Sequence, residues 1–258
     1  MTADPGEAVR LRVDLAYDGS GFHGFARQRG VRTVQGVLEE ALERLAGVAV
    51  TTTGAGRTDA GVHALAQVVT CDVPAGSRLR LGDPERLRRA LDHLCGPEIA
   101  VWSVRAVTSG FDARFSAQRR HYRYRLYDAE AMNPLWRHDT WHLGPPSLDT
   151  AAMGAGGRHL VGEHDFSSFC RRAGDKPLVR RVERLEVRRD HAGLVIAEVV
   201  GAAFCHQMVR SIVGCLVPVG QGRRRADQVR DIRDARDRQM VGAIAPPHGL
   251  TLIAVDYP

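Results

Sequence analysis

Lysine is almost absent from this chain of 258 residues. Of its 36 basic side chains only Lys176 is a lysine, and the rest are arginines. The codon bias of a GC-rich genome would explain this shortage without any binding role. The formal net charge is nevertheless +6 and the sequence pI about 9.4. Because guanidinium groups pair bidentately with phosphate and stack on bases, this charge favours a polyanionic partner such as RNA.

Paired cysteine motifs are also missing. The chain has five cysteines, an odd number, and they stand singly without a C-x-x-C pair: Cys71, Cys95, Cys170, Cys205 and Cys215. This spacing argues against a zinc ribbon and against a disulfide framework. We therefore expect buried free thiols in a reducing cytosol.

Long apolar segments are the third absence. No apolar run approaches the roughly 18–20 residues of a membrane span, and residues 1–10 contain no apolar signal core. We therefore expect a cytoplasmic protein without a membrane partner. The overall hydrophobic content of 44% and charged content of 26% are typical of a globular protein. The length suits one large domain or two smaller ones.

Hydrophobic periodicity predicts alternating strands and helices in the first half of the chain. The expected elements are a strand at 11–17, a helix at 34–45, strands at 48–53 and 67–73, a helix opening at Asp83 and Pro84, and a strand at 99–107. Thr33 is the expected N-cap of the first helix, and Gly47 is expected to end it. The order β-α-β-β-α-β is typical of ferredoxin-like, split βαβ units.

The second half repeats this order with one extra helix. The expected strands are 119–128, 180–189, 194–201 and 250–255, the expected helices are 147–160, 206–219 and 226–238, and the expected connections or surface loops are 162–166 and 171–177. The fold class is therefore α+β, with two ferredoxin-like halves whose mixed or antiparallel sheets form a central cleft. We place the domains at 1–107 and 108–258, and we expect Asp59 near the cleft, a usual location for a ligand site.

The segment from Gly54 to His63 reads Gly-Ala-Gly-Arg-Thr-Asp-Ala-Gly-Val-His. It places Asp59 among glycines on a loop that leaves a β-branched strand, where a ligand can approach the backbone closely. A turn with a solvated aspartate is the simpler interpretation of an isolated Arg-Thr-Asp, because turns attract aspartate and glycine. The full string favours a functional aspartate over a solvated one, through its likeness to a known family.

This string resembles the signature of the TruA family of tRNA pseudouridine synthases, and four further places in the chain resemble that family in the right order. They are Tyr17–Phe22 with Phe25–Gln28, Phe111–Ala117 with Tyr122–Tyr124, Phe204–Gly214, and Gly249–Tyr257. In the third of these, Gln207 stands where the family commonly has a second histidine. The matches extend over essentially the whole chain, and the resemblance implies the pseudouridine synthase fold.

The resemblance implies that Asp59 is the catalytic nucleophile. Pseudouridine formation breaks the N1–C1′ bond, turns the uracil and joins C5 to C1′. No redox step occurs and the atoms balance, so we expect no cofactor and no metal. The carboxylate must be ionised at C1′, and a neighbouring guanidinium favours that form. Arg57 and Arg210 are the two candidates for this support. Arg57 is also suited to holding the flipped nucleotide.

The target uridine must be extruded from its stack before it can react, so an aromatic face is expected to hold it. The resemblance assigns this substrate-binding role to Tyr122, whose phenol could also relay a proton. By alternation Tyr122, Tyr124 and Leu126 share one strand face, and Tyr124 is expected to be a core residue. The candidate RNA contacts are His63, His206, Arg27 and Gln28.

The sequence therefore predicts an isomerase that forms pseudouridine at positions 38, 39 and 40 in the anticodon arm of tRNA, as a homodimer. A non-catalytic RNA-binding protein on tandem ferredoxin-like units is the main alternative, but it would need no carboxylate in a glycine-rich loop. A glycoside hydrolase is a second alternative. It would need two carboxylates facing one bond, whereas only Asp59 lies in a motif, with Asp72 the nearest acid downstream.

Overall fold

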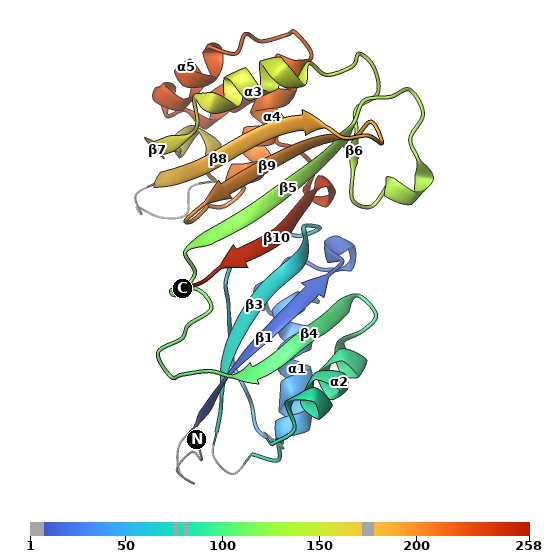
Figure 1. Cartoon of the computed structure of the whole chain (residues 1–258), viewed down its shortest axis with the longest axis vertical. Coiled ribbons are helices and arrows are strands. Elements are labelled where there is room, and N and C mark those ends of the chain that lie inside the picture. The colour runs from blue at the N-terminus through green and yellow to red at the C-terminus, as the bar shows by residue number, and fades with distance from the viewer. Residues whose placement is uncertain (1–7, 75–76, 80–81, 172–177) are drawn as a thin grey trace. The chain divides into compact units, whose positions relative to one another are not determined.

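A computed structural model of the chain describes residues 8–74, 77–79, 82–171 and 178–258 (Figure 1). These residues belong to two compact units. Unit 1 comprises Met1–Gln118 with Leu252–Pro258, and unit 2 comprises Arg119–Thr251. The division at 107 and 108 predicted from the sequence stays a prediction about separable domains. No helix among the described residues is long and apolar enough to cross a membrane.

Unit 1 is built on paired strands with two helices on one face (Figure 1). Its elements are β1 (Val9–Tyr17), α1 (Val34–Ala46), β2 (Thr52–Gly54), β3 (His63–Val73), α2 (Pro84–Cys95), β4 (Ile99–Ala106) and β10 (Leu250–Asp256). The strand order is β4-β1-β3-β10, and β2 pairs with β3. Val13 in the central β1 lies opposite Val69 on one side and Val104 on the other, and it is fully buried.

Side chains next to the first turns cap both helices of unit 1, and a glycine ends α1. The Thr33 side chain accepts a hydrogen bond from the Gly36 N–H at 3.2 Å, which caps α1. Gly47, with φ of 73°, ends α1 in the left-handed region. Asp83 caps α2 through the Arg86 N–H at 2.9 Å. The predicted caps of both helices are therefore confirmed.

Unit 2 is likewise built on paired strands, with its helices on one face (Figure 1). Its elements are β5 (Arg119–Tyr127), β6 (Trp141–His142), α3 (Thr150–Arg158), β7 (Gly162–Asp165), β8 (Val179–Arg189), β9 (Val195–Gly201), α4 (Met208–Gly220) and α5 (Gln228–Ala235). The strand order is β5-β9-β8-β7, all antiparallel, with β6 parallel to β5. Short 3₁₀ turns lie at Gly19–Gly21, Pro134–Trp136, Ser167–Phe169, Arg238–Val241 and Pro247–Gly249.

The predicted α+β class and the order of the main elements are confirmed, and three local predictions are wrong. The strand expected at 48–53 is only Thr52–Gly54, because β2 pairs with just three residues of β3. The strand expected at 67–73 begins earlier, at His63. The connection expected at 162–166 contains β7, which pairs with Val179–Val182. Of the loop expected at 171–177, only Arg171 lies among the described residues.

The expectation of free thiols is wrong for two of the five cysteines. Cys170 and Cys205 form a disulfide, although 35 residues separate them in the sequence. Their Cα atoms are 5.7 Å apart, which is within the range that a disulfide requires. Single cysteines without a motif gave no sign of this pairing, because only the tertiary fold brings the two segments together. Cys71, Cys95 and Cys215 are free and buried, as expected.

Candidate active site

The loop that carries Asp59 connects β2 to β3 in unit 1, and its side chains alternate in exposure. Arg57 is exposed, Thr58 is buried and Asp59 is half-buried. The Val62 N–H donates to the Asp59 carbonyl at 3.2 Å, which closes a tight turn just after the carboxylate. Gly61 supplies the left-handed residue of this turn, with φ of 77°. The loop therefore exposes Arg57 and half-buries Asp59, while the buried Thr58 anchors it.

A buried polar network lies under this loop. The Gln67 side chain is fully buried and makes hydrogen bonds through both ends of its amide. Its Nε2 donates to the Gly56 carbonyl at 2.8 Å and to the Tyr17 hydroxyl at 3.3 Å, and its Oε1 accepts from the N–H groups of Gly56 and Val68 at 3.3 and 3.2 Å. The amide thus bonds to both the N–H and the carbonyl of Gly56, as the backbone of a neighbouring strand would.

Tyr17 extends this network to the residue before the carboxylate. Its hydroxyl lies 2.8 Å from Oγ1 of Thr58. Burial raises the pKa of Tyr17 to about 12, so the phenol keeps its proton at neutral pH and can donate to Thr58. The Thr58 carbonyl accepts from the Phe25 N–H at 3.1 Å. Thr58 is therefore held through its side chain and its backbone.

Two glycines allow the segment around Phe25 to approach the loop closely. Gly24 has φ of 96°, and a Cβ there would lie 3.0 Å from the Thr58 carbonyl oxygen and 3.4 Å from the Asp59 carbonyl carbon. The Phe25 ring packs on Gly54, where a Cβ would come within 2.5 Å of the ring. A side chain at either position would displace the loop. Phe25 thus supports the candidate site through packing within unit 1.

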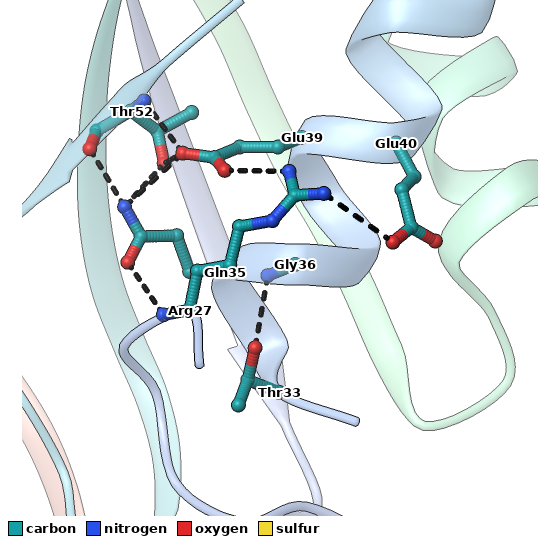
Figure 2. A network of polar contacts seen from close by, with 7 residues as sticks. All are labelled: Arg27, Thr33, Gln35, Gly36, Glu39, Glu40 and Thr52. Carbon is teal, nitrogen blue, oxygen red and sulfur yellow. Dashed lines mark hydrogen bonds and ion pairs between the residues drawn. The ribbon is translucent and has the colours of Figure 1, made fainter. Parts of the chain in front are cut away.

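Figure 2 shows a further network, which holds the next segment of chain against α1 and β2. Glu39, buried on α1, accepts from the N–H and Oγ1 of Thr52 at 2.9 and 3.0 Å and from Nη1 of Arg27 at 3.0 Å. Gln35 accepts from the Arg27 N–H at 2.9 Å and donates to the Thr52 carbonyl at 2.8 Å. The Arg27 side chain is 50% exposed, and Nη2 also approaches Glu40 at 3.8 Å.

Two more of the candidate RNA contacts lie in unit 1. Gln28 is exposed and donates to the His23 carbonyl at 3.1 Å. His63 is buried at the start of β3, where its Nδ1 lies 3.0 Å from the Gly19 N–H and 3.1 Å from the Asp18 carboxylate. Neutral Nδ1 accepts from Gly19, whereas protonated Nδ1 would donate to Asp18. A contact of either residue with RNA stays a prediction.

Unit 2 supplies Tyr122, on β5. The expected alternation is confirmed, since Tyr122, Tyr124 and Leu126 are buried while the residues between them are not. Tyr122 meets Phe204 edge to face at a centroid distance of 5.2 Å. Tyr124 is a core residue, as expected. Its hydroxyl donates to the Pro246 carbonyl at 2.7 Å, and burial raises its pKa far above the ordinary value.

Arg210 lies in the first turn of α4. Its Nε donates to the Ala245 carbonyl at 2.8 Å, and its own carbonyl accepts from the Ala245 N–H at 3.2 Å. This close approach requires Gly214, because a Cβ there would lie 2.2 Å from the Ala243 carbonyl oxygen. Arg210 is therefore half-buried and fixed at two points to one residue. His206, just before α4, is exposed.

Unit 1 thus brings together Asp59, Arg57 and the residues that anchor their loop, and unit 2 holds Tyr122 and Arg210. The sequence analysis missed the anchoring role of Tyr17 and Gln67. A polar residue at a core position of an apolar strand was the available signal for Gln67. No group of three or more His, Cys, Asp and Glu side chains in the described part of the chain could hold a metal ion.

The chain belongs to the tRNA pseudouridine synthase family. The family model matches it twice, over residues 15–116 and 157–258. The chain is therefore an isomerase that converts uridine to pseudouridine in tRNA. These two matched segments also support the pseudouridine synthase fold expected from the sequence.

Several relatives share most of the chain, and each is named tRNA pseudouridine synthase A. The protein of Frankia casuarinae is 47% identical over 254 residues, which cover 97% of this chain and 90% of the relative. The Corynebacterium glutamicum protein is 44% identical, with 97% and 90% covered. The Methylobacterium protein is also 44% identical, with 96% of this chain and 98% of the relative covered.

Proposed function

We propose that this chain forms pseudouridine at positions 38, 39 and 40 in the anticodon arm of tRNA, with Asp59 as the nucleophile at C1′. One observation carries the assignment of Asp59. Its half-buried carboxylate stands on a loop whose backbone is held by Gln67, Phe25 and Val62. A nucleophile must keep its direction toward the reacting atom, and a loop fixed from several sides meets that need.

The reaction asks little of the protein beyond position and charge. The N1–C1′ bond breaks, the C5–C1′ bond forms, and the proton lost from C5 balances the one gained at N1. Asp59 in its ionised form attacks or stabilises C1′ as positive character develops there. Arg57, exposed two residues earlier, is suited to holding the extruded nucleotide by its phosphate.

Arg210 and Tyr122 take the remaining roles in the proposal, on the resemblance to the family. Arg210 favours the ionised carboxylate and fixes its direction. Its attachment to Ala245 supports this role, because a hydrogen bond at Nε fixes the orientation of the planar guanidinium. Tyr122 offers an aromatic face to the uracil and a phenol that can relay the C5 proton.

The remaining candidate residues are proposed as RNA contacts. His206 is exposed beside α4, and Arg27 keeps half of its side chain exposed while paired with Glu39. Gln28 and His63 complete this set.

We further propose that the protein is a cytoplasmic homodimer. Light scattering on the purified protein should then give about twice the chain mass of 28.3 kDa.

The decisive experiment maps pseudouridine in a tRNA transcript that carries uridine at positions 38, 39 and 40. Carbodiimide labelling after incubation with the purified protein should reveal conversion at these positions. A matched transcript with cytidine at all three should remain unlabelled. Conversion elsewhere in the tRNA would overturn the choice of site, and no conversion in any tRNA would overturn the function.

A further inference from the structure

Arg238 is a half-buried cation with an incomplete set of hydrogen bonds among the described residues. It opens the 3₁₀ turn Arg238–Val241 that follows α5. Its Nη2 donates to Oε1 of Gln207 at 2.6 Å. Its Nη1 is buried and has no hydrogen-bond partner among the described residues. A buried donor without an acceptor is costly, and more so on a charged group, so this nitrogen calls for an explanation.

Among the described residues, the charged groups that act on the pKa of Arg238 have the same sign as its own. Burial lowers the pKa of its guanidinium, and the nearby guanidinium groups of Arg171 and Arg210 lower it further. The group still keeps its charge at neutral pH, because arginine titrates so far above that range. A partly buried cation beside like charges is unfavourable unless an anion joins them.

Three separate segments of unit 2 converge at this place. Gln207 precedes α4 with φ of 66°, a left-handed conformation that is uncommon outside glycine and asparagine. The Arg171 N–H donates to the His206 carbonyl at 2.9 Å, and the neighbouring Cys170 is bonded to Cys205. The fold thus fixes the backbone of Arg171 to the segment that positions Arg238. Strained backbone of this kind is concentrated at binding sites.

We propose that Arg238, with Arg171 beside it, binds a backbone phosphate of the RNA substrate. The proposal rests on the proposed function for the nature of the ligand. A phosphate is tetrahedral, carries negative charge and presents several acceptor oxygens, so it supplies an acceptor for Nη1 and a counter-charge, neither of which the described residues provide. Gln207 holds Nη2, which orients the guanidinium and leaves Nη1 to meet a phosphate oxygen.

The salt dependence of RNA affinity tests this contact. Arg238→Gln should raise the Kd for a tRNA anticodon stem-loop roughly tenfold. A plot of log Kd against log salt concentration should be shallower than that of the parent by roughly 0.7–0.9, the value for one phosphate contact. The control is Arg230→Gln, which removes the same charge from an exposed arginine that lies 3.7 Å from Asp231. Equal slopes for parent and Arg238→Gln would overturn the proposal.

Stability separates a binding role from a structural one. Arg238→Gln removes a partly buried charge that has no counter-ion among the described residues, so the melting temperature of the RNA-free protein should stay equal to the parent's or rise. A clear fall would identify Arg238 as a structural residue and overturn the proposal. Should this variant not fold, Arg171→Gln takes its place, because Arg171 is exposed. It should flatten the salt plot in the same direction, and an unchanged plot would count against the site.

A chemical substitution in the RNA identifies the phosphate. We would replace single phosphates of the stem-loop by neutral methylphosphonates and measure Kd for each. At one position the neutral linkage should weaken binding to the parent but not to Arg238→Gln, because this variant already lacks the contact with that phosphate. Equal losses in both proteins at every position would overturn the assignment. Tight binding of inorganic phosphate to the parent with unchanged RNA slopes would assign the site to a free phosphate instead.

These measurements follow binding and do not require conversion of uridine. A parent that binds RNA through Arg238 but forms no pseudouridine would contradict the proposed function alone. A parent that forms pseudouridine with the same salt slope as Arg238→Gln would contradict this inference alone.

Discussion

In unit 1 the amide of Gln67 meets both polar groups of Gly56, whereas in unit 2 the buried Nη1 of Arg238 meets no acceptor among the described residues. Both are polar groups inside a sheet-and-helix unit. The first is neutral and its hydrogen bonds are made within the unit. The second is charged, and its hydrogen bonds are incomplete. This contrast supports our two proposals, that unit 1 holds a reactive carboxylate in place and that unit 2 offers charge to a ligand.

The largest expected effect tests whether unit 1 carries the chemistry. Asp59→Asn should lower the single-turnover rate of pseudouridine formation by more than about 10³-fold, because the amide cannot act as a nucleophile. The Kd for tRNA should change little, since affinity comes mainly from phosphate contacts. Residual turnover within about tenfold of the parent, about 1.4 kcal/mol of transition-state stabilisation, would contradict the assignment.

A second test asks whether the neutral network positions the carboxylate. Gln67→Met leaves both polar groups of Gly56 without partners and should cost about 1–3 kcal/mol of stability. It should also lower the rate at saturating tRNA by roughly 10–100-fold, because small displacements of a reacting group are costly. The control is Val69→Ala, a fully buried change on the same strand, at a position that lies opposite Val13 in β1. Equal rate losses in both variants would reduce the network to a structural role.

A third comparison lies within unit 1, between the two partners of an ion pair. Glu39→Ala removes the acceptor of the Thr52 N–H and hydroxyl, so it should lower the free energy of unfolding in urea by about 1–3 kcal/mol. Arg27→Gln should have a smaller effect on unfolding, because Arg27 is half exposed. If Arg27 contacts RNA, only this second variant should raise the Kd for tRNA. The reverse pattern would show that Arg27 is purely structural.

The smallest expected effect is on how the free energy of unfolding depends on pH. Burial raises the pKa of Cys71 to about 12, whereas an unfolded thiol titrates near 8.5. The folded state therefore holds this proton more tightly, so the stabilisation is complete below the unfolded pKa and is lost as pH rises toward 12. Cys95, with a pKa raised to about 11, adds a second such thiol to unit 1, and Cys215 adds one to unit 2.

Urea unfolding between pH 9 and pH 10.5 measures this effect. Each such thiol contributes a loss of about 1.4 kcal/mol per pH unit once the unfolded thiol is ionised. Cys71→Ala should therefore make stability fall less steeply with pH than in the parent, whatever its effect at neutral pH. An unchanged slope would show that the Cys71 thiol is accessible to hydroxide in the folded protein.

Sequence patterns predicted features that depend on neighbouring residues. Thr33 and Gly47 bound α1 because a cap acts on the turn beside it. Tyr122 and Tyr124 share a buried face because side chains alternate along any strand. For the candidate site, the glycine-rich string located Asp59 and its loop, and the resemblance to a family supplied its role.

Features that depend on distant segments were not predicted. Residues 48–51 have strand-forming side chains but no partner strand in the described sheet, so β2 is short. Cys170 and Cys205 meet only through the tertiary fold. The side chain of Arg238 meets Gln207, which lies 31 positions earlier in the chain. An arginine in a basic chain carries no sign of such surroundings.

The last residues of the chain have a consequence for biosynthesis. Residues 252–258 belong to unit 1, where the Tyr257 hydroxyl donates to the Ala113 carbonyl at 2.7 Å and the Tyr257 ring lies 4.7 Å from the Arg12 guanidinium carbon. Residues 119–251 of unit 2 are contiguous, whereas unit 1 is made of two segments that the whole of unit 2 separates in the chain. Domains generally fold as units during synthesis. The unit that carries Asp59 therefore cannot be completed until residues that follow the segment carrying Arg210 and Arg238 have been added.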